Sequence, residues 1–340
     1  MKDTFIDKNK NDYFSYLRGI DLQELLLETE NYLLEYRDGL GLPGDITFGV
    51  EIEYEGVVKY GVDCYVKKNL SNWASDTDGT LMSGGEIISP IMTDNLKYWQ
   101  ELQKICKYLS RKGADTTHRA GGHIHIGTCG LGSEIDAWRQ FLKLYMLYES
   151  VIFRFVNGDK INGRKEQTRF ASPIVDYLHC RLGNINSATS LQDIRDILMT
   201  VHFKEIHHLT RYTAINFTNV DFKNPDYNYE KNTIEFRSPN ATTNAIIWQN
   251  NINAFAKILL VSKNGKLDED FLDYKLENEF VPYTGNEYLY DIVNFKEVLE
   301  FVDLVFDNNI DKVYFLRQYL KNFQDGFGLK AATKAKKFTR

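Results

Sequence analysis

Three short segments of this chain alternate charged and apolar residues with the two-residue period of a β-strand. They are ITFGVEIEYE (46–55), GHIHIG (122–127) and TIEFR (233–237). Successive side chains of a strand point to opposite faces, so each segment carries its acid, His or Arg residues on one face and its apolar residues on the other. If the segments share a sheet, their polar faces combine into one surface of carboxylates and imidazoles, which are ligands for divalent cations. The pattern therefore predicts both a sheet and a metal site on it.

Each segment also has a purely structural explanation. The polar faces carry Glu51, Glu53 and Glu55 in the first segment, His123 and His125 in the second, and Glu235 and Arg237 in the third. Charged residues are ordinary on the wet face of an antiparallel strand, and Glu235 with Arg237 fits a cross-strand salt bridge. Two imidazoles two residues apart in a Gly-flanked apolar strand are less ordinary, because such glycines often mark the close approach of a ligand. The His pair is the strongest single indication of a functional site.

Composition and charge limit the classes of protein. Hydrophobic residues make up 43% of the 340 residues, enough for a sizeable core, and the net charge of −6 argues against a dedicated nucleic-acid binder. The four cysteines show no CxxC spacing. The N-terminal sequence lacks the apolar stretch of a signal peptide, and no apolar run reaches the ~20 residues of a membrane span. We expect a cytoplasmic protein without a membrane partner, and the sequence leaves its oligomeric state open.

The chain divides into three parts by pattern. Residues 1–44 form an N-terminal helical segment, with a helix over 13–37, and end in a Gly- and Pro-rich break. Residues 45–265 form the core, and 266–340 form a C-terminal helical extension with a basic tail. Strands interleaved with helices predict an α+β fold. Within the core, the sequence also predicts strands over 57–66 and 210–220, a loop over 73–80, and helices over 94–112, over 133–155 and from Ser190 onward.

Several catalytic motifs are missing. The sequence contains no GxxxxGK[ST] loop and no GxSxG elbow, and its cysteines lack the surroundings of a nucleophile. If the protein binds a nucleotide, metal ions and Arg side chains must hold the phosphates. Arg211 is a candidate for this role.

Four motifs in order resemble those of the amidoligase family. They are GVEIE (49–53), DGT followed by GGEIISP (78–90), GGHIHIG (121–127) and TIEFRSPN (233–240). That family belongs to the carboxylate–amine ligase superfamily, together with glutamine synthetase and glutamate–cysteine ligase. Each motif is short, but four in the order of the family are specific. The resemblance covers residues 46–250 and leaves the helical ends outside.

The resemblance implies a curved, mainly antiparallel sheet that binds Mg-ATP through two or three divalent ions. It implies metal ligands at Glu51, Glu53, Glu86, His123 and Glu235. His125 and Arg211 then lie near phosphate, Arg237 steadies the transferred phosphoryl group, and Asp76 and Asp78 lie toward the substrate end. Arg237 and Glu53 are the expected catalytic residues. Glu55 has no counterpart and is expected to be a bystander.

The implied reaction joins a carboxylate to an amine at the expense of ATP, through an acyl phosphate, with Mg²⁺ or Mn²⁺ as cofactor. The substrates are expected to be small-molecule or peptide carboxylates and amines. Two alternatives stay open. The HxH strand also occurs in zinc-dependent amidohydrolases, which need further ligands on later strands of a barrel. A non-catalytic binding protein on a ligase-like scaffold is the other alternative.

Overall fold

The computed structural model describes residues 33–116, 119–158, 170–199, 212–229, 231–280, 292–320 and 324–325. Its centre is a six-stranded antiparallel sheet in the order β3-β4-β2-β5-β7-β6. The strands are β2 (Phe48–Glu55), β3 (Ala74–Asp76), β4 (Gly84–Ile88), β5 (Gly122–Gly127), β6 (Ile215–Asn216) and β7 (Thr233–Phe236). A two-stranded parallel pair, β1 (Leu33–Leu34) with β8 (Gln324–Asp325), lies near the chain ends. The predicted α+β fold with a mainly antiparallel sheet is confirmed.

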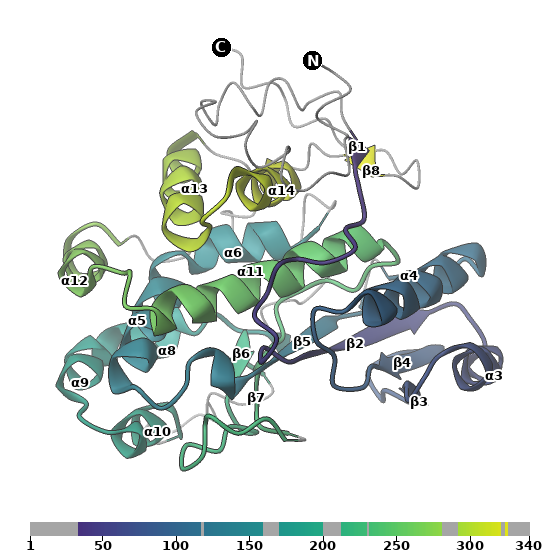
Figure 1. The fold of residues 1–340 in the computed structure, drawn as a ribbon, viewed down its shortest axis with the longest axis horizontal. Coiled ribbons are helices and arrows are strands. Elements are labelled where there is room, and N and C mark those ends of the chain that lie inside the picture. Colours follow the sequence, from purple (N-terminus) through teal and green to yellow (C-terminus); the bar gives the residue numbers. More distant parts are fainter. Residues whose placement is uncertain are drawn as a thin grey trace.

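Helices surround this sheet (Figure 1). Those that precede β6 are α3 (Lys59–Asn69), α4 (Leu96–Arg111), α5 (Ile135–Leu147), α6 (Glu149–Val156), α8 (Val175–Leu178), α9 (Leu182–Ser187) and α10 (Leu191–Met199). Those that follow β7 are α11 (Ala245–Lys263), α12 (Glu269–Asn278), α13 (Ile292–Val305) and α14 (Asn309–Leu320). Among the described residues, none of these helices is both long and apolar enough to cross a membrane.

The apolar face of the sheet packs on three of these helices. Phe48 of β2 stacks on Trp99 of α4, with ring centroids 5.1 Å apart. Phe236 of β7 stacks on Phe255 of α11 at 3.9 Å and meets the edge of Phe141 of α5. Burial of this face fixes the register, because a shift by one residue would turn the charged side chains into the core. The opposite face is thereby left with the polar residues.

Several predicted elements are confirmed and others are wrong. The three alternating segments form β2, β5 and β7, and the predicted helix over 94–112 is α4. The predicted strand over 57–66 is wrong, because this stretch is helix α3 and buries Val62 and Val66, four residues apart, on one side. Part of the predicted loop over 73–80 is strand β3. Within the described residues 212–220 of the predicted strand over 210–220, the strand is only the short β6.

Two predicted helices also differ from the structure. The helix predicted over 133–155 is interrupted at Tyr148, where α5 ends and α6 begins. The helix predicted over 13–37 falls mostly outside the described residues. Its last part is not helical, since Leu33 and Leu34 form β1 and residues 35–37 are irregular.

Candidate metal and phosphate site

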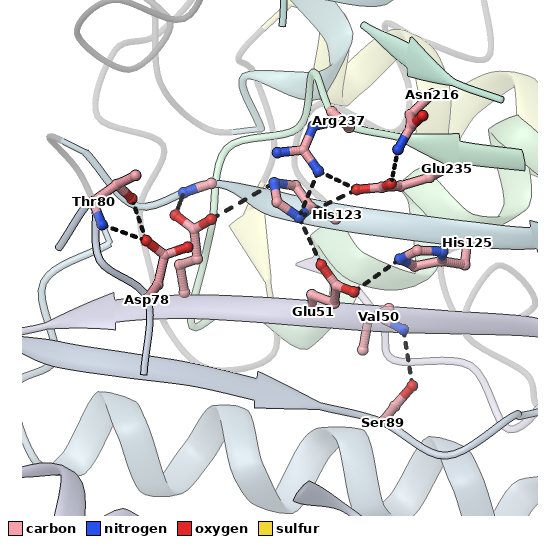
Figure 2. A network of polar contacts seen from close by, with 12 residues as sticks. Val50, Glu51, Asp78, Thr80, Ser89, His123, His125, Asn216, Glu235 and Arg237 are labelled. Carbon is pink, nitrogen blue, oxygen red and sulfur yellow. Dashed lines mark hydrogen bonds and ion pairs between the residues drawn. The ribbon is translucent and has the colours of Figure 1, made fainter. Parts of the chain in front are cut away.

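Strand pairing gathers the predicted polar residues on one face of the sheet. In the register of β2 with its two neighbours, Glu51 lies opposite His123 and Glu53 lies opposite Glu86. On the next strand, His125 lies opposite Glu235. Directly opposite side chains share a face of a sheet, so residues far apart in the sequence become neighbours. Figure 2 shows the carboxylates and imidazoles pointing toward one another.

Glu51 lies at the centre and contacts both histidines. Its Oε2 is 2.7 Å from Nδ1 of His123, and its Oε1 is 3.0 Å from Nε2 of His125. Burial raises the pKa of Glu51, but hydrogen bonds to the two imidazoles outweigh it and hold this pKa well below the usual range. For His125, burial lowers the pKa and the contact with Glu51 outweighs it, so the net shift is upward. These contacts favour the ionised form of Glu51, the form in which a carboxylate binds metal.

Glu235 and Arg237 form an ion pair beside this centre. The Arg237 guanidinium contacts Oε1 of Glu235 and lies 3.5 Å from Nδ1 of His123. The other carboxylate oxygen, Oε2, accepts a hydrogen bond of 2.6 Å from Nδ2 of Asn216. Burial raises the pKa of Glu235, yet the nearby His123 and Arg237 bring it below its ordinary value. An ion pair between these two residues is thus present in the polar face, but it is not cross-strand as the sequence suggested, because Arg237 directly follows the strand that carries Glu235.

A second group of carboxylates lies at the β3–β4 end of the face. Glu53 is buried and accepts a 2.5 Å hydrogen bond from the backbone N–H of Gly121. Glu86 lies opposite Glu53, and burial together with the charges of Glu51 and Glu53 raises the pKa of Glu86 to about 8. Burial is the larger cause of this shift, and the part due to Glu51 and Glu53 reflects the negative charge gathered at this end of the site. This end of the site has the electrostatics of a cation site.

Three groups of side chains offer metal-ligand atoms within 4.8 Å of one another in the described part of the chain: Glu51–Glu86–His123, Glu51–His125–Glu235 and Glu53–Asp78–Glu86. Carboxylate oxygens with one imidazole nitrogen are suitable for Mg²⁺ and, because of the nitrogen, for Mn²⁺. The residues present therefore fit the divalent cations that the sequence motifs imply.

The structure brings together nearly all of the predicted site residues. Glu51, Glu53, Glu86, His123, His125, Glu235 and Arg237 share the face, while Arg211 lies outside the described residues. Glu55 belongs to none of the three candidate groups, and its Oε1 accepts a hydrogen bond from the backbone N–H of Met82. Glu55 thus lies outside the candidate metal groups, and its bystander role stays a prediction.

The polar face also contains two residues whose part in it the sequence pattern does not indicate clearly. Asp78 forms the predicted turn with Thr80, since the backbone N–H of Thr80 donates to the Asp78 carboxylate at 2.6 Å. Asp78 also belongs to the candidate metal group with Glu53 and Glu86. Asn216 was missed because β6 is too short for its alternation to be recognised. The predicted hairpin between 210–220 and 233–237 is the feature that could have indicated Asn216, because pairing of β6 with β7 places Asn216 opposite Glu235.

Comparison with known proteins agrees with the geometry. A search of curated proteins gives no match to the chain. The family model of amidoligase enzymes matches residues 56–259, more than half of the chain. The matched residues include strands β3 to β7 and therefore Glu86, His123, His125, Glu235 and Arg237. Strand β2, which carries Glu51 and Glu53, precedes the matched residues but pairs with β4 and β5 in the middle of the same sheet. The chain belongs to the amidoligase family.

Proposed function

We propose that the protein is an ATP-dependent ligase that joins a carboxylate to an amine. The observation that carries this proposal is the convergence of four glutamates, two histidines and one arginine on a single sheet face, from β2, β4, β5, β7 and the residue directly after β7. A protein would not retain so much negative charge in a partly buried site without cations to offset it. Amide formation with ATP needs such a site, because phosphoryl transfer depends on charge neutralisation and positioning more than on a protein nucleophile.

The proposed reaction has two steps. The substrate carboxylate oxygen takes the γ-phosphoryl group of ATP, and ADP leaves. The amine nitrogen then attacks the acyl carbon, the C–O bond to phosphate breaks, and the nitrogen loses a proton. The product is an amide, and ADP and phosphate are released.

Each residue of the face has a proposed role in this reaction. Glu51, Glu53, Glu86, His123 and Glu235 would hold Mg²⁺ or Mn²⁺, with Asp78 as an additional oxygen ligand. Bound divalent cations would neutralise phosphate charge. Arg237, which contacts Glu235 and lies near His123, would stabilise charge on the transferring phosphoryl group, and His125 would lie beside the phosphates.

The hydrolase alternative has less support. It requires a barrel with further ligands on later strands, whereas the sheet of the described residues is open and antiparallel. His179, one of the histidines available to it, lies away from the face, with Nε2 3.0 Å from the carbonyl oxygen of Leu276 and its ring stacked on Phe280. Tightly bound zinc and hydrolysis without nucleotide would favour it over the ligase.

The test combines turnover with binding. The wild-type chain is incubated with Mg-ATP and pools of carboxylic acids and amines, phosphate release is followed, and amide products are identified by mass spectrometry. Calorimetry measures the affinity for Mg-ATP in Glu53→Gln and Glu235→Gln, which we expect to lose about 10-fold or more of it because each loses a charged ligand.

Glu55→Gln is the matched control. Glu55 lies on the same strand face as Glu53 but outside the candidate metal groups, and Gln keeps the oxygen that accepts from Met82. We expect this variant to bind Mg-ATP like the wild type. Equal binding by all three variants would show that the assigned metal site is wrong.

A further inference from the structure

Asn216 lies beside Glu235 on the polar face and is itself buried, with 4% of its surface exposed. Its Nδ2 donates a 2.6 Å hydrogen bond to Oε2 of Glu235. This is a short bond to a carboxylate that is also buried, and such charge-assisted bonds are the strong ones. The contact therefore fixes the orientation of the Glu235 carboxylate.

A second pair of contacts fixes the orientation of the Asn216 amide. Its Oδ1 accepts hydrogen bonds from the backbone N–H of Thr218 at 3.0 Å and from the Thr218 hydroxyl at 2.8 Å. A backbone N–H can only donate, so the amide atom facing it must be the oxygen. The amide nitrogen then necessarily faces Glu235, and the whole chain of contacts has one direction, from Thr218 through Asn216 to Glu235.

This arrangement divides the two oxygens of Glu235 between different partners. Oε2 is held by Asn216, while Oε1 contacts Arg237 and lies 3.6 Å from Nδ1 of His123. A guanidinium can bind both oxygens of a free carboxylate with its parallel donors. In this structure Arg237 contacts Oε1 of Glu235, and Asn216 contacts Oε2.

Glu53 shows the same division on β2, on the other side of β5 from Glu235. Its Oε2 accepts from the backbone N–H of Gly121 at 2.5 Å, and its Oε1 lies 3.6 Å from Nε2 of His123. One oxygen of each carboxylate is thus held by a neutral donor and the other faces His123. We propose that Asn216 is a positioning residue that fixes the orientation of the Glu235 carboxylate, so that Oε1 stays directed toward the divalent-cation site beside His123. The inference rests on the metal site of the proposed function.

The test measures binding of Mn²⁺ alone to the full-length chain by calorimetry. Asn216→Leu keeps the size of the side chain and removes its donor, and Asn216→Ala is a second variant in case Leu does not fold. We expect the Kd for Mn²⁺ to rise about 10- to 100-fold, the usual effect of losing a contact that orients a metal ligand. Thr218→Val keeps its backbone N–H and loses only the hydroxyl, so its Kd should rise less.

Asn250→Leu is the matched control. Asn250 is also a buried amide that donates to a side-chain oxygen, Oε1 of Gln318, but it lies on α11 away from the polar face. Its replacement should lower stability and leave the Kd for Mn²⁺ unchanged.

The outcomes separate the two proposals. Wild-type protein that binds no Mn²⁺ would refute the metal site of the proposed function and the role of Asn216 with it. Tight binding by wild type that is unchanged in folded Asn216 variants would overturn the inference alone, as would an equal loss in Asn250→Leu. Should neither Asn216 variant fold, unchanged binding by Thr218→Val would overturn it and weakened binding would support it.

Discussion

At the scale of single residues, Arg237 offers the planar set of donors that matches a phosphoryl group, which lysine lacks. Its Nη1 contacts Oε1 of Glu235 and lies 3.5 Å from Nδ1 of His123. We predict that Arg237→Lys lowers the kcat for ATP-dependent phosphate release about 100-fold or more, because the charge remains but the donors no longer match the transferring phosphoryl group. The initial rate of phosphate release, with the acid and amine that the wild type accepts, is the measurement.

A conservative change at another acid-paired arginine is the control for this prediction. Arg139 pairs with Asp136 at 2.7 Å and with Glu269 at 3.2 Å, on helices α5 and α12. Arg139→Lys should therefore turn over like the wild type. Equal rates in Arg237→Lys and wild type would remove Arg237 from the proposed chemistry.

Glu149 is a buried acid outside the polar face that should make stability depend on pH. Burial raises the pKa of Glu149 to about 8, although the backbone N–H groups of Ile174 and Val175 donate to its carboxyl group at 2.8 and 2.9 Å. The unfolded chain releases this proton near the ordinary pKa of 4.5. Between these two values the folded state binds more protons, so Glu149 contributes less stability as pH rises, by at most about 1.4 kcal/mol per pH unit.

The variant Glu149→Gln isolates this effect because Gln does not titrate. We predict that the free energy of unfolding of the wild type, minus that of Glu149→Gln, decreases from pH 5 toward pH 8, as measured by urea denaturation. A difference that stays constant over this range would show that Glu149 is already ionised in the folded protein.

At the scale of elements, two Ser-x-x-Asp sequences near helix starts behave differently. At the start of α10 the Ser190 backbone N–H donates to the Asp193 carboxylate at 2.9 Å, and the Asp193 backbone N–H donates to the Ser190 hydroxyl at 3.2 Å. Ser133 and Asp136 have the same spacing, but α5 begins only at Ile135 and has no side-chain cap. Capping depends on where packing lets a helix begin, which spacing alone does not determine.

We therefore predict that Ser190→Ala lowers the free energy of unfolding by about 1 kcal/mol, because the first turn of α10 loses a hydrogen-bond acceptor. The paired variant Ser133→Ala should change it by less than about 0.5 kcal/mol. Urea denaturation of both variants measures the difference. Equal losses in the two variants would mean that the Ser190 contact contributes nothing beyond an ordinary surface hydroxyl.

At the scale of the whole molecule, the C-terminal helices share their packing with the core. One cluster of buried apolar residues runs from Leu40 to Leu320 and includes both the sheet and α13 and α14. Phe315 of α14 is 2% exposed and stacks on Phe155 of α6 with ring centroids 4.0 Å apart. The division at residue 265 predicted from the sequence is thus crossed by close contacts.

We predict that Phe315→Ala destabilises the whole protein by about 3–5 kcal/mol, the cost of a large cavity in a core. The four tryptophans all lie within residues 45–265, so their fluorescence reports on the core and not on α14. If the chain unfolds as one unit, the fluorescence transition in urea shifts to lower concentration in the variant. A fluorescence transition that does not move would show that the C-terminal extension unfolds as a separate domain.

The sequence by itself determined the local elements of the site. Alternation with a period of two specified β2, β5 and β7 and put Glu51, His123 and Glu235 on their polar faces, because the side-chain direction along a strand depends only on the backbone of that strand. The same local rules failed for 57–66, where β-branched residues suggested a strand. Packing of Val62 and Val66 made this stretch a helix instead.

Only the tertiary structure decided which polar residues meet. The order β4-β2-β5-β7-β6 brings Glu86, Glu51, His123, Glu235 and Asn216 onto adjacent strands, and it depends on pairing between segments that lie far apart in the sequence. A single sequence has no local signal for the strand register, for the approach of Asp78 to Glu53 and Glu86, or for that of Asn216 to Glu235. These arise because the opposite, apolar face of the sheet is buried on α4, α5 and α11. The alternating residues therefore predicted a polar face, and packing on the far side of the sheet assembled it into a site.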